Sequence, residues 1–345
     1  MRVSTTIGTK TVSDISQLQL PVKATSPSGA PTNPKYFMYF TFSGTNQAFQ
    51  SGYLGITNSC IQGTLHIKSS MLKQPLLAKQ IVLTLKCVQF AHWSAGRTRV
   101  SASLKTLDLS QTLFTSNDPK GYQLLNDCEF PFVFPLPATA VGSLHTDACR
   151  IEYQLDAKLK RKKVKWYQLS SRAEWTLLPV LWYAFPTMEM YQPAILSNTD
   201  SKIQWSFSIP KKHVAPNEVI NARLNITFLN PSISIKSIEY GLKTYMYVRA
   251  GKWSFTGKLR MTKAKGMGNE FTGDLLIKVP GDVISTTNGP LIKVEHKIKV
   301  KVSLSGAKDI EIEQPVIASN VMPTELHQQL LRAQNLISYN MQRLN

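Results

Sequence analysis

A strict alternation of apolar and polar residues constrains the fold of this chain more than any other feature of its sequence. From Ile151 to Lys160 the odd positions are apolar and the even positions are polar or charged. Successive side chains of a β-strand point to opposite faces, so this pattern predicts a half-buried antiparallel strand. The same period runs from Ile292 to Leu304, where the polar face carries four lysines and Glu295. We expect these lysines to be solvated and to oppose sheet-to-sheet aggregation.

The segment before the first of these strands is rich in phenylalanine and proline. Phe130, Phe132 and Phe134 alternate with Pro131, Val133 and Pro135. Proline cannot donate a ladder hydrogen bond, so we predict an extended segment at the edge of a sheet rather than a central strand. Similar short runs recur through the N-terminal half of the chain and no long helical pattern interrupts them there, which indicates the all-β class.

The chain of 345 residues is long enough for two domains, each with its own core. Prolines at 179, 186 and 193 predict a stiff, extended connector between them. Near the C-terminus, apolar residues spaced by three and four predict an amphipathic helix. The predicted organisation is a flexible segment 1–35, a sandwich 36–178, a connector 179–200, a second sandwich 201–318 and a helix 323–345.

The charge of the chain predicts an anionic partner, because 40 basic residues face 21 acidic ones and leave a net charge of +19. Membrane headgroups, phosphorylated protein and nucleic acid all fit this charge. We define the basic tip as the cations that end the strand 151–160 and follow it: Lys158, Lys160, Arg161, Lys162, Lys163 and Lys165. It is either a hairpin end kept soluble by charge or an anion site. At a membrane, each basic residue near an anionic surface contributes about 1 kcal/mol.

A second basic patch surrounds Trp253 and Phe255. Basic and aromatic residues mixed in this way would also suit single-stranded nucleic acid. We rank that reading lower because no nucleic-acid motif accompanies the patch. Its cations are Arg249, Lys252, Lys258, Arg260, Lys263 and Lys265.

Residue patterns typical of catalysis or metal binding do not occur in the sequence. The six histidines show no metal-ligand spacing, and His296 falls on the apolar face of its strand. We therefore expect no enzyme activity, metal or cofactor. The cysteines at 60, 87, 128 and 149 lie far apart, and the N-terminus has no apolar signal region, which favours reduced thiols in the cytosol. Asn33, Pro34 and Tyr36 form an N-P-x-Y sequence, a weak adaptor motif, although Tyr36 also fits the start of a strand.

Several stretches between residues 36 and 317 resemble the arrestin superfamily, and within it the α-arrestin-like proteins. From the N- to the C-terminus they are GTLHIK, IVLTLKCV, FPFVFPLP with IEYQLDAKLKR, IQWSFSIPKKHVAPNEVINARLNI and VEHKIKVKVSLSGAKDIEIEQPVI. The resemblance implies two immunoglobulin-like antiparallel β-sandwiches in tandem. It also implies a cytoplasmic, non-enzymatic adaptor at the plasma membrane or endosomes, which binds membrane-protein cargo tails and sorting or ubiquitin-ligase machinery.

Two departures from that family limit what carries over. Many α-arrestins recruit WW-domain ligases through P-P-x-Y motifs, and this sequence has none. The charged cluster that locks other arrestins cannot be placed by motif, so activation by phosphate is not carried over. Three alternatives stay open: a retromer-type arrestin-fold sorting subunit, a basic β-sandwich nucleic-acid-binding protein, and a viral-type sandwich coat protein.

Overall fold

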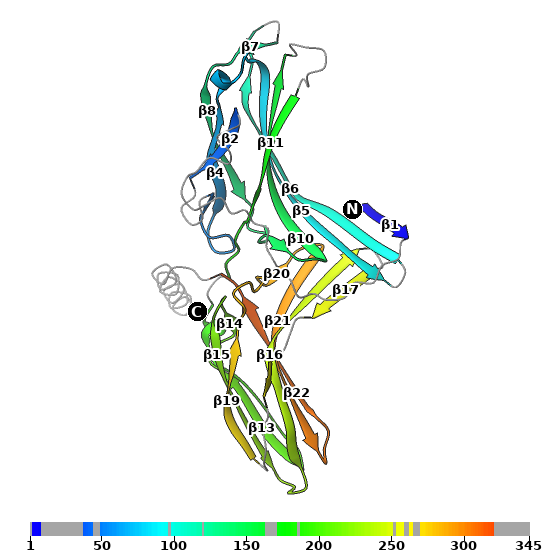
Figure 1. Cartoon of the computed structure of the whole chain (residues 1–345). Coiled ribbons are helices and arrows are strands. Elements are labelled where there is room, and N and C mark those ends of the chain that lie inside the picture. Colours follow the sequence, from blue (N-terminus) through cyan, green and yellow to red (C-terminus); the bar gives the residue numbers. More distant parts are fainter. Residues whose placement is uncertain are drawn as a thin grey trace, which may run out of the picture. The chain divides into compact units, whose positions relative to one another are not determined.

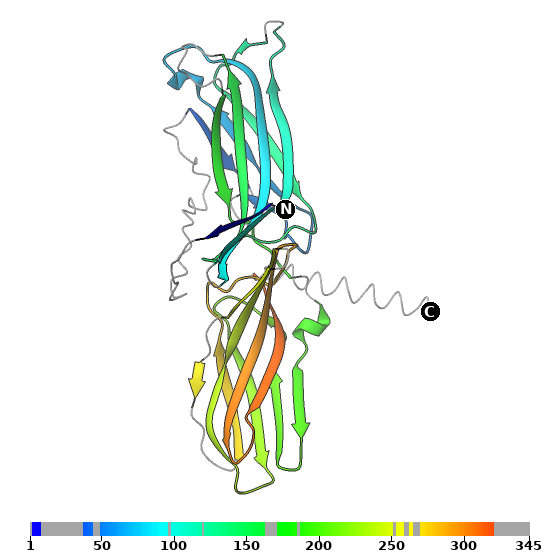
Figure 2. The ribbon, with the colours of Figure 1, turned by 90° about the vertical axis from the view of Figure 1, so that its right-hand side faces the viewer.

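The computed structural model describes residues 2–7, 37–43, 49–95, 98–118, 121–162, 171–184, 187–250, 253–258, 262–264 and 270–320. The chain divides into two compact units, Met1–Leu181 and Trp182–Asn345, each built from two β-sheets (Figures 1 and 2). In the described residues, the 3₁₀ turn η1 (Ser69–Met71) and the short helix α1 (Met188–Tyr191) are the only helical elements, and all other regular elements are strands. The prediction of an all-β chain with two successive sandwiches is confirmed.

Unit 1 contains one sheet of seven described strands and one of four. The larger sheet has the order β1-β6-β5-β10-β11, with β7 beside β5 and β9 beside β10. In the smaller sheet, β4 pairs with β2, β3 and β8. The larger sheet comprises β1 (Arg2–Ile7), β5 (Leu77–Ala95), β6 (Thr98–Thr115), β7 (Gln123–Leu124), β9 (Leu144–His145), β10 (Cys149–Arg161) and β11 (Ser171–Leu178). The smaller comprises β2 (Met38–Phe42), β3 (Gln50–Ser51), β4 (Ser59–Ile67) and β8 (Cys128–Leu136).

Strand β10 is an inner strand of the larger sheet of unit 1. It lies between β5 and β11, and its odd-numbered residues from Ile151 to Leu159 are buried while the even-numbered ones face outward. Tyr153, the bulkiest of the buried set, donates its hydroxyl to the carbonyl of Val141 at 2.7 Å, which satisfies its one polar group. The alternation in the sequence therefore places the core on one face of β10 and the charged residues on the other.

The phenylalanine–proline segment forms β8, which pairs with β4 alone among the described strands. The predicted edge position is thus confirmed. Phe132 turns into the core and lies 6.1 Å from the ring of Phe40 and 6.3 Å from that of Phe42. Gly63 of β4 is its cross-strand partner, and a Cβ there would lie 2.2 Å from the carbonyl oxygen of Thr41 and 3.0 Å from the Phe132 ring. The glycine leaves the space that the ring needs.

Unit 2 repeats the arrangement with a described sheet of four strands and one of seven. The smaller has the order β12-β13-β15-β19, and the larger β14-β22-β21-β16-β17, with β18 beside β16 and β20 beside β21. The smaller comprises β12 (Ala194–Thr199), β13 (Ile203–Ile209), β15 (Val219–Phe228) and β19 (Glu270–Lys278). The larger comprises β14 (His213–Val214), β16 (Ser234–Ala250), β17 (Trp253–Lys258), β18 (Thr262–Ala264), β20 (Thr287–Asn288), β21 (Ile292–Ser305) and β22 (Ile310–Ala318).

Two predicted segments differ in detail from the structure. Arg2–Ile7, inside the segment 1–35 that we expected to be flexible, forms β1 along Thr98–Ser103 of β6, because the backbone of an edge strand accepts a β-branched partner such as VSTTI. The unit boundary falls between Leu181 and Trp182, and Ala194–Thr199 of the predicted connector forms β12. Residues 8–36 and the predicted helix 323–345 lie outside the described residues.

Candidate anion-binding surface

The described part of the basic tip lies where β10 ends. Lys158 and Lys160 project from the outer face of the strand and are exposed, and Lys162, just beyond the end of β10, is also exposed. The Lys160 ammonium donates to the side-chain carbonyl of Gln80 at 3.0 Å, and the Lys162 backbone N–H donates to the carbonyl of Leu77 at 2.9 Å. Both contacts hold the tip against the start of β5. Lys163 and Lys165 lie outside the described residues.

The structure adds Lys79 to this surface, a cation that the sequence analysis did not select. Lys160 pairs with Gln80 and Arg161 with Ala78, so the register of β10 and β5 skips Lys79. This bulge leaves Lys79 out of the ladder with an exposed side chain. No local sequence signal marks the bulge, because it depends on the pairing of residues about eighty positions apart.

Cations in the first half of β10 and its neighbour have carboxylate partners. The Lys86 ammonium lies 3.1 Å from a carboxylate oxygen of Asp156, and Arg150 lies 3.5 Å from Glu152. Beyond Asp156 the pattern changes, and none of the ion pairs among the described residues involves Lys158, Lys160, Arg161 or Lys162. One strand therefore carries neutralised charge along its middle and uncompensated positive charge at its end.

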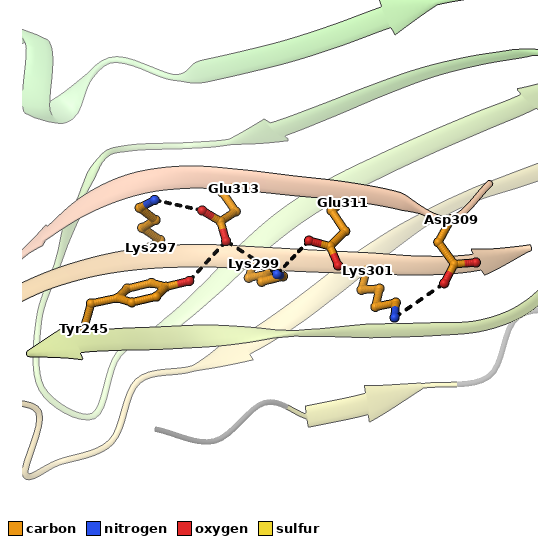
Figure 3. A network of polar contacts seen from close by, with 7 residues as sticks. All are labelled: Tyr245, Lys297, Lys299, Lys301, Asp309, Glu311 and Glu313. Atoms are coloured by element: carbon orange, nitrogen blue, oxygen red, sulfur yellow. Dashed lines mark hydrogen bonds and ion pairs between the residues drawn. The ribbon is translucent and has the colours of Figure 1, made fainter. Parts of the chain in front are cut away.

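The lysines of β21 in unit 2 show the opposite situation (Figure 3). Lys297 pairs with Glu313 at 2.8 Å, Lys299 with Glu311 at 2.9 Å, and Lys301 with Asp309 at 3.4 Å. The acids all come from β22 or the turn before it. We predicted that this lysine face is solvated, but its ammonium groups are paired, and Lys299 is only 13% exposed. These lysines are therefore poor candidates for binding an external anion.

The pKa directions agree with this neutralisation. The hydrogen bond from Lys297 lowers the pKa of Glu313, and the one from Lys299 lowers the pKa of Glu311. The same hydrogen bonds raise the pKa values of Lys297 and Lys299, because each charge stabilises its partner's charged form. Tyr245 also donates its hydroxyl to Glu313 at 3.1 Å, which joins β16 to this network (Figure 3).

The remaining predicted site residues are placed only in part. In the second basic patch, Arg249 of β16 is exposed, while Lys258 and Lys263 belong to β17 and β18, which both pair with β16. Lys252, Arg260 and Lys265 lie outside the described residues, as do Asn33, Pro34 and Tyr36 of the N-P-x-Y sequence. The second patch and that motif therefore stay predictions.

Neither a metal site nor a membrane-spanning helix occurs among the described residues. No group of three or more His, Cys, Asp or Glu side chains in that part of the chain could hold a metal ion. No helix there is long and apolar enough to cross a membrane.

Most of unit 2 resembles a known protein family. Residues 199–320 match the family model of the arrestin (or S-antigen) C-terminal domain, from the last residue of β12 to the residues that follow β22. The two β-sheets of unit 1, which precede this stretch, are consistent with an arrestin N-terminal domain. A search of curated proteins found no match.

Proposed function

We propose that this chain is a non-enzymatic adaptor of the α-arrestin type. It links membrane-protein cargo tails to endocytic, sorting or ubiquitin-ligase machinery, at the cytoplasmic face of the plasma membrane or endosomes. The match of residues 199–320 to an arrestin C-terminal domain and the tandem sandwiches support the adaptor class. Because the sequence has no P-P-x-Y motif, the proposal does not include direct recruitment of WW-domain ligases.

The uncompensated cations of the basic tip carry the second half of the proposal, which is docking to an anionic surface. Lys158, Lys160 and Lys162 are exposed, and no described carboxylate pairs with them. Exposed charges without internal partners lose little by moving from water to an anionic surface and gain its attraction. Between the lysine faces of β10 and β21, the described contacts leave the one on β10 in this condition.

Reversing the charge of the tip tests the proposal. We expect Lys160→Glu, Arg161→Glu, Lys162→Glu and Lys163→Glu together to weaken binding to phosphoinositide vesicles at least about a hundredfold, at about 1 kcal/mol per basic residue. Co-sedimentation measures the binding, and circular dichroism checks the fold. The matched control is the same charge change on four exposed cations of unit 2, Lys202, Arg223, Lys236 and Lys278, which should bind far better than the tip variant.

Two outcomes would reject docking through the tip. One is vesicle binding by the tip variant that equals wild type. The other is tight, steeply salt-dependent binding of single-stranded oligonucleotide without vesicle binding, which would favour the nucleic-acid alternative.

Removing an acid should have the opposite effect. Asp156→Asn deletes the carboxylate that neutralises Lys86 of β5. Asp156 lies on the face of β10 that also carries Lys158 and Lys160. We expect vesicle affinity to rise about fivefold, because one more cation faces the lipid. Asp274→Asn is the control, since it changes the net charge equally on the exposed face of β19. Equal gains in the two variants would mean that net charge, rather than the face of β10, governs binding.

A further inference from the structure

One end of unit 1 combines exposed apolar side chains with the cations of the basic tip. Met71 of η1 is 49% exposed and Leu124 of β7 is 54% exposed. We call these two residues the apolar pair. Figures 1 and 2 both place β7, the last residues of β10 and the first residues of β11 at the same end of the unit.

Backbone pairing brings Leu124, one of the apolar pair, next to the tip. Leu77, at the start of β5, pairs with Leu124 of β7 on one side and accepts the Lys162 N–H at 2.9 Å on the other. Leu125 also donates its N–H to the carbonyl of Leu76 at 2.8 Å. One residue of β5 therefore separates an exposed leucine from an exposed lysine, and both are held by the sheet.

Residues around η1 continue this surface. A shallow depression of about 550 Å³ is lined by residues 69–70, 72–76 and 124–127, of which Leu72, Pro75, Leu76, Leu124 and Leu125 are apolar. Asp127 accepts hydrogen bonds from the Ser70 N–H at 2.8 Å and from the hydroxyls of both Ser69 and Ser70, which fix η1. Lys73, two residues beyond Met71, adds another exposed cation.

We propose that this end of unit 1 is a membrane-docking surface in which the apolar pair enters the interface of an anionic bilayer. Lys73, Lys79, Lys158, Lys160 and Lys162 then face the lipid phosphates around the inserted side chains. The inference rests on the proposed docking function and specifies its partner as a lipid surface. It also assigns a role to Met71 and Leu124, which charge alone did not identify.

The apolar pair distinguishes a bilayer from other anions. A phosphopeptide or a nucleic-acid backbone could satisfy the cations but would leave Met71 and Leu124 in water. A bilayer offers both phosphates and hydrocarbon, and transfer of apolar surface from water is favourable in proportion to its area. Since backbone hydrogen bonds already hold β7, insertion of Leu124 loses little conformational entropy.

Vesicle binding of the full chain at two salt concentrations tests the inference. The probes are phosphatidylcholine vesicles with and without phosphatidylserine. At about 1 M salt the Debye length falls to about 3 Å, so the binding that remains reports apolar contact. We expect Met71→Ser with Leu124→Ser to weaken binding to the anionic vesicles about tenfold at low salt and to remove the binding that resists high salt.

The control is Val133→Ser, because Val133 is 56% exposed but projects from β8 in the smaller sheet. It should bind as wild type does at both salt concentrations. If the variant with Met71→Ser and Leu124→Ser binds as wild type does at both salt concentrations, the apolar inference is overturned while docking through cations stands. If wild type does not bind anionic vesicles at all, both proposals fail. If the variant with Met71→Ser and Leu124→Ser loses no more affinity than the Val133→Ser control, general surface hydrophobicity is responsible and the inference is again overturned.

Discussion

Replacing Phe132 by alanine is expected to destabilise unit 1 by about 4 kcal/mol, the largest effect of a single substitution that we predict. The ring is 2% exposed and contacts three other phenylalanine rings, with centroid distances of 6.1 Å to Phe40, 6.3 Å to Phe42 and 6.1 Å to Phe134. The cavity would not collapse readily, because Gly63 across the strand has no side chain to fill it. Urea unfolding of the full chain measures the loss, and limited proteolysis identifies which unit opens.

The neighbouring residue supplies the control for this substitution. Val133 is the next residue on the same strand but faces outward, so Val133→Ala should cost less than about 1 kcal/mol. Equal losses in the two variants would show that β8 contributes only strand propensity and that the aromatic cluster is not the core of this sheet.

The second large effect concerns His296 and the stability of unit 2 in mild acid. His296 is 1% exposed on β21, and Thr244 of β16 lies 3.0 Å from its Nδ1. Burial lowers the pKa of the imidazole from 6.5 to about 4, because the charged form would lose its hydration. The unfolded chain therefore takes up a proton at this residue between pH 6.5 and about 4, whereas the folded chain does not.

Stability should consequently fall as the pH falls through that window. From 1.36 kcal/mol per unit, unit 2 loses about 2 kcal/mol between neutral pH and about pH 5 and about 3 kcal/mol by about pH 4. The variant His296→Gln should show a flatter dependence on pH, whatever its stability at neutral pH. Urea midpoints measured from about pH 7 to about pH 5 avoid the titration of Glu311 and Glu313, whose pKa values are lowered and which act below that range.

A histidine at the surface controls for the loss of the residue type. His92 is exposed on β5, so His92→Gln removes a histidine without touching the core of unit 2. Parallel pH profiles for wild type and His296→Gln would contradict the prediction, because a buried neutral histidine must contribute to the slope.

Strands with one buried face were predictable because burial imposes the period of two directly on their composition. The predicted strand Ile292–Leu304 corresponds to β21, Ile292–Ser305, and the predicted strand Ile151–Lys160 lies within β10, Cys149–Arg161. Strand β1 was not predictable in this way, since it is held by backbone pairing with β6 and RVSTTI shows no alternation. Likewise, β12 lies in a segment that prolines marked as a connector.

The candidate site was predictable only as a set of cations. Lys158 and Lys160 were predicted as site residues from their position at the end of an alternating strand, and the same alternation predicted that the lysines of β21 are solvated. Which of them has a carboxylate partner depends on the strand alongside: β22 brings Glu311 and Glu313 to Lys299, whereas Gln80 and Val82 lie opposite Lys160 and Lys158. Lys79 and Leu124 joined the site for the same reason, since strand pairing places both of them, whereas Met71 lies in the turn η1.

The amino-acid sequence by itself determined the β class, the two sandwiches and the inward or outward direction of most strand residues, because these follow from the local period and from the need to bury apolar side chains. Only the tertiary structure decided which charges are neutralised and which apolar side chains stay exposed beside them. Both depend on strand register between residues distant in the chain, where a shift by one position exchanges every cross-strand partner.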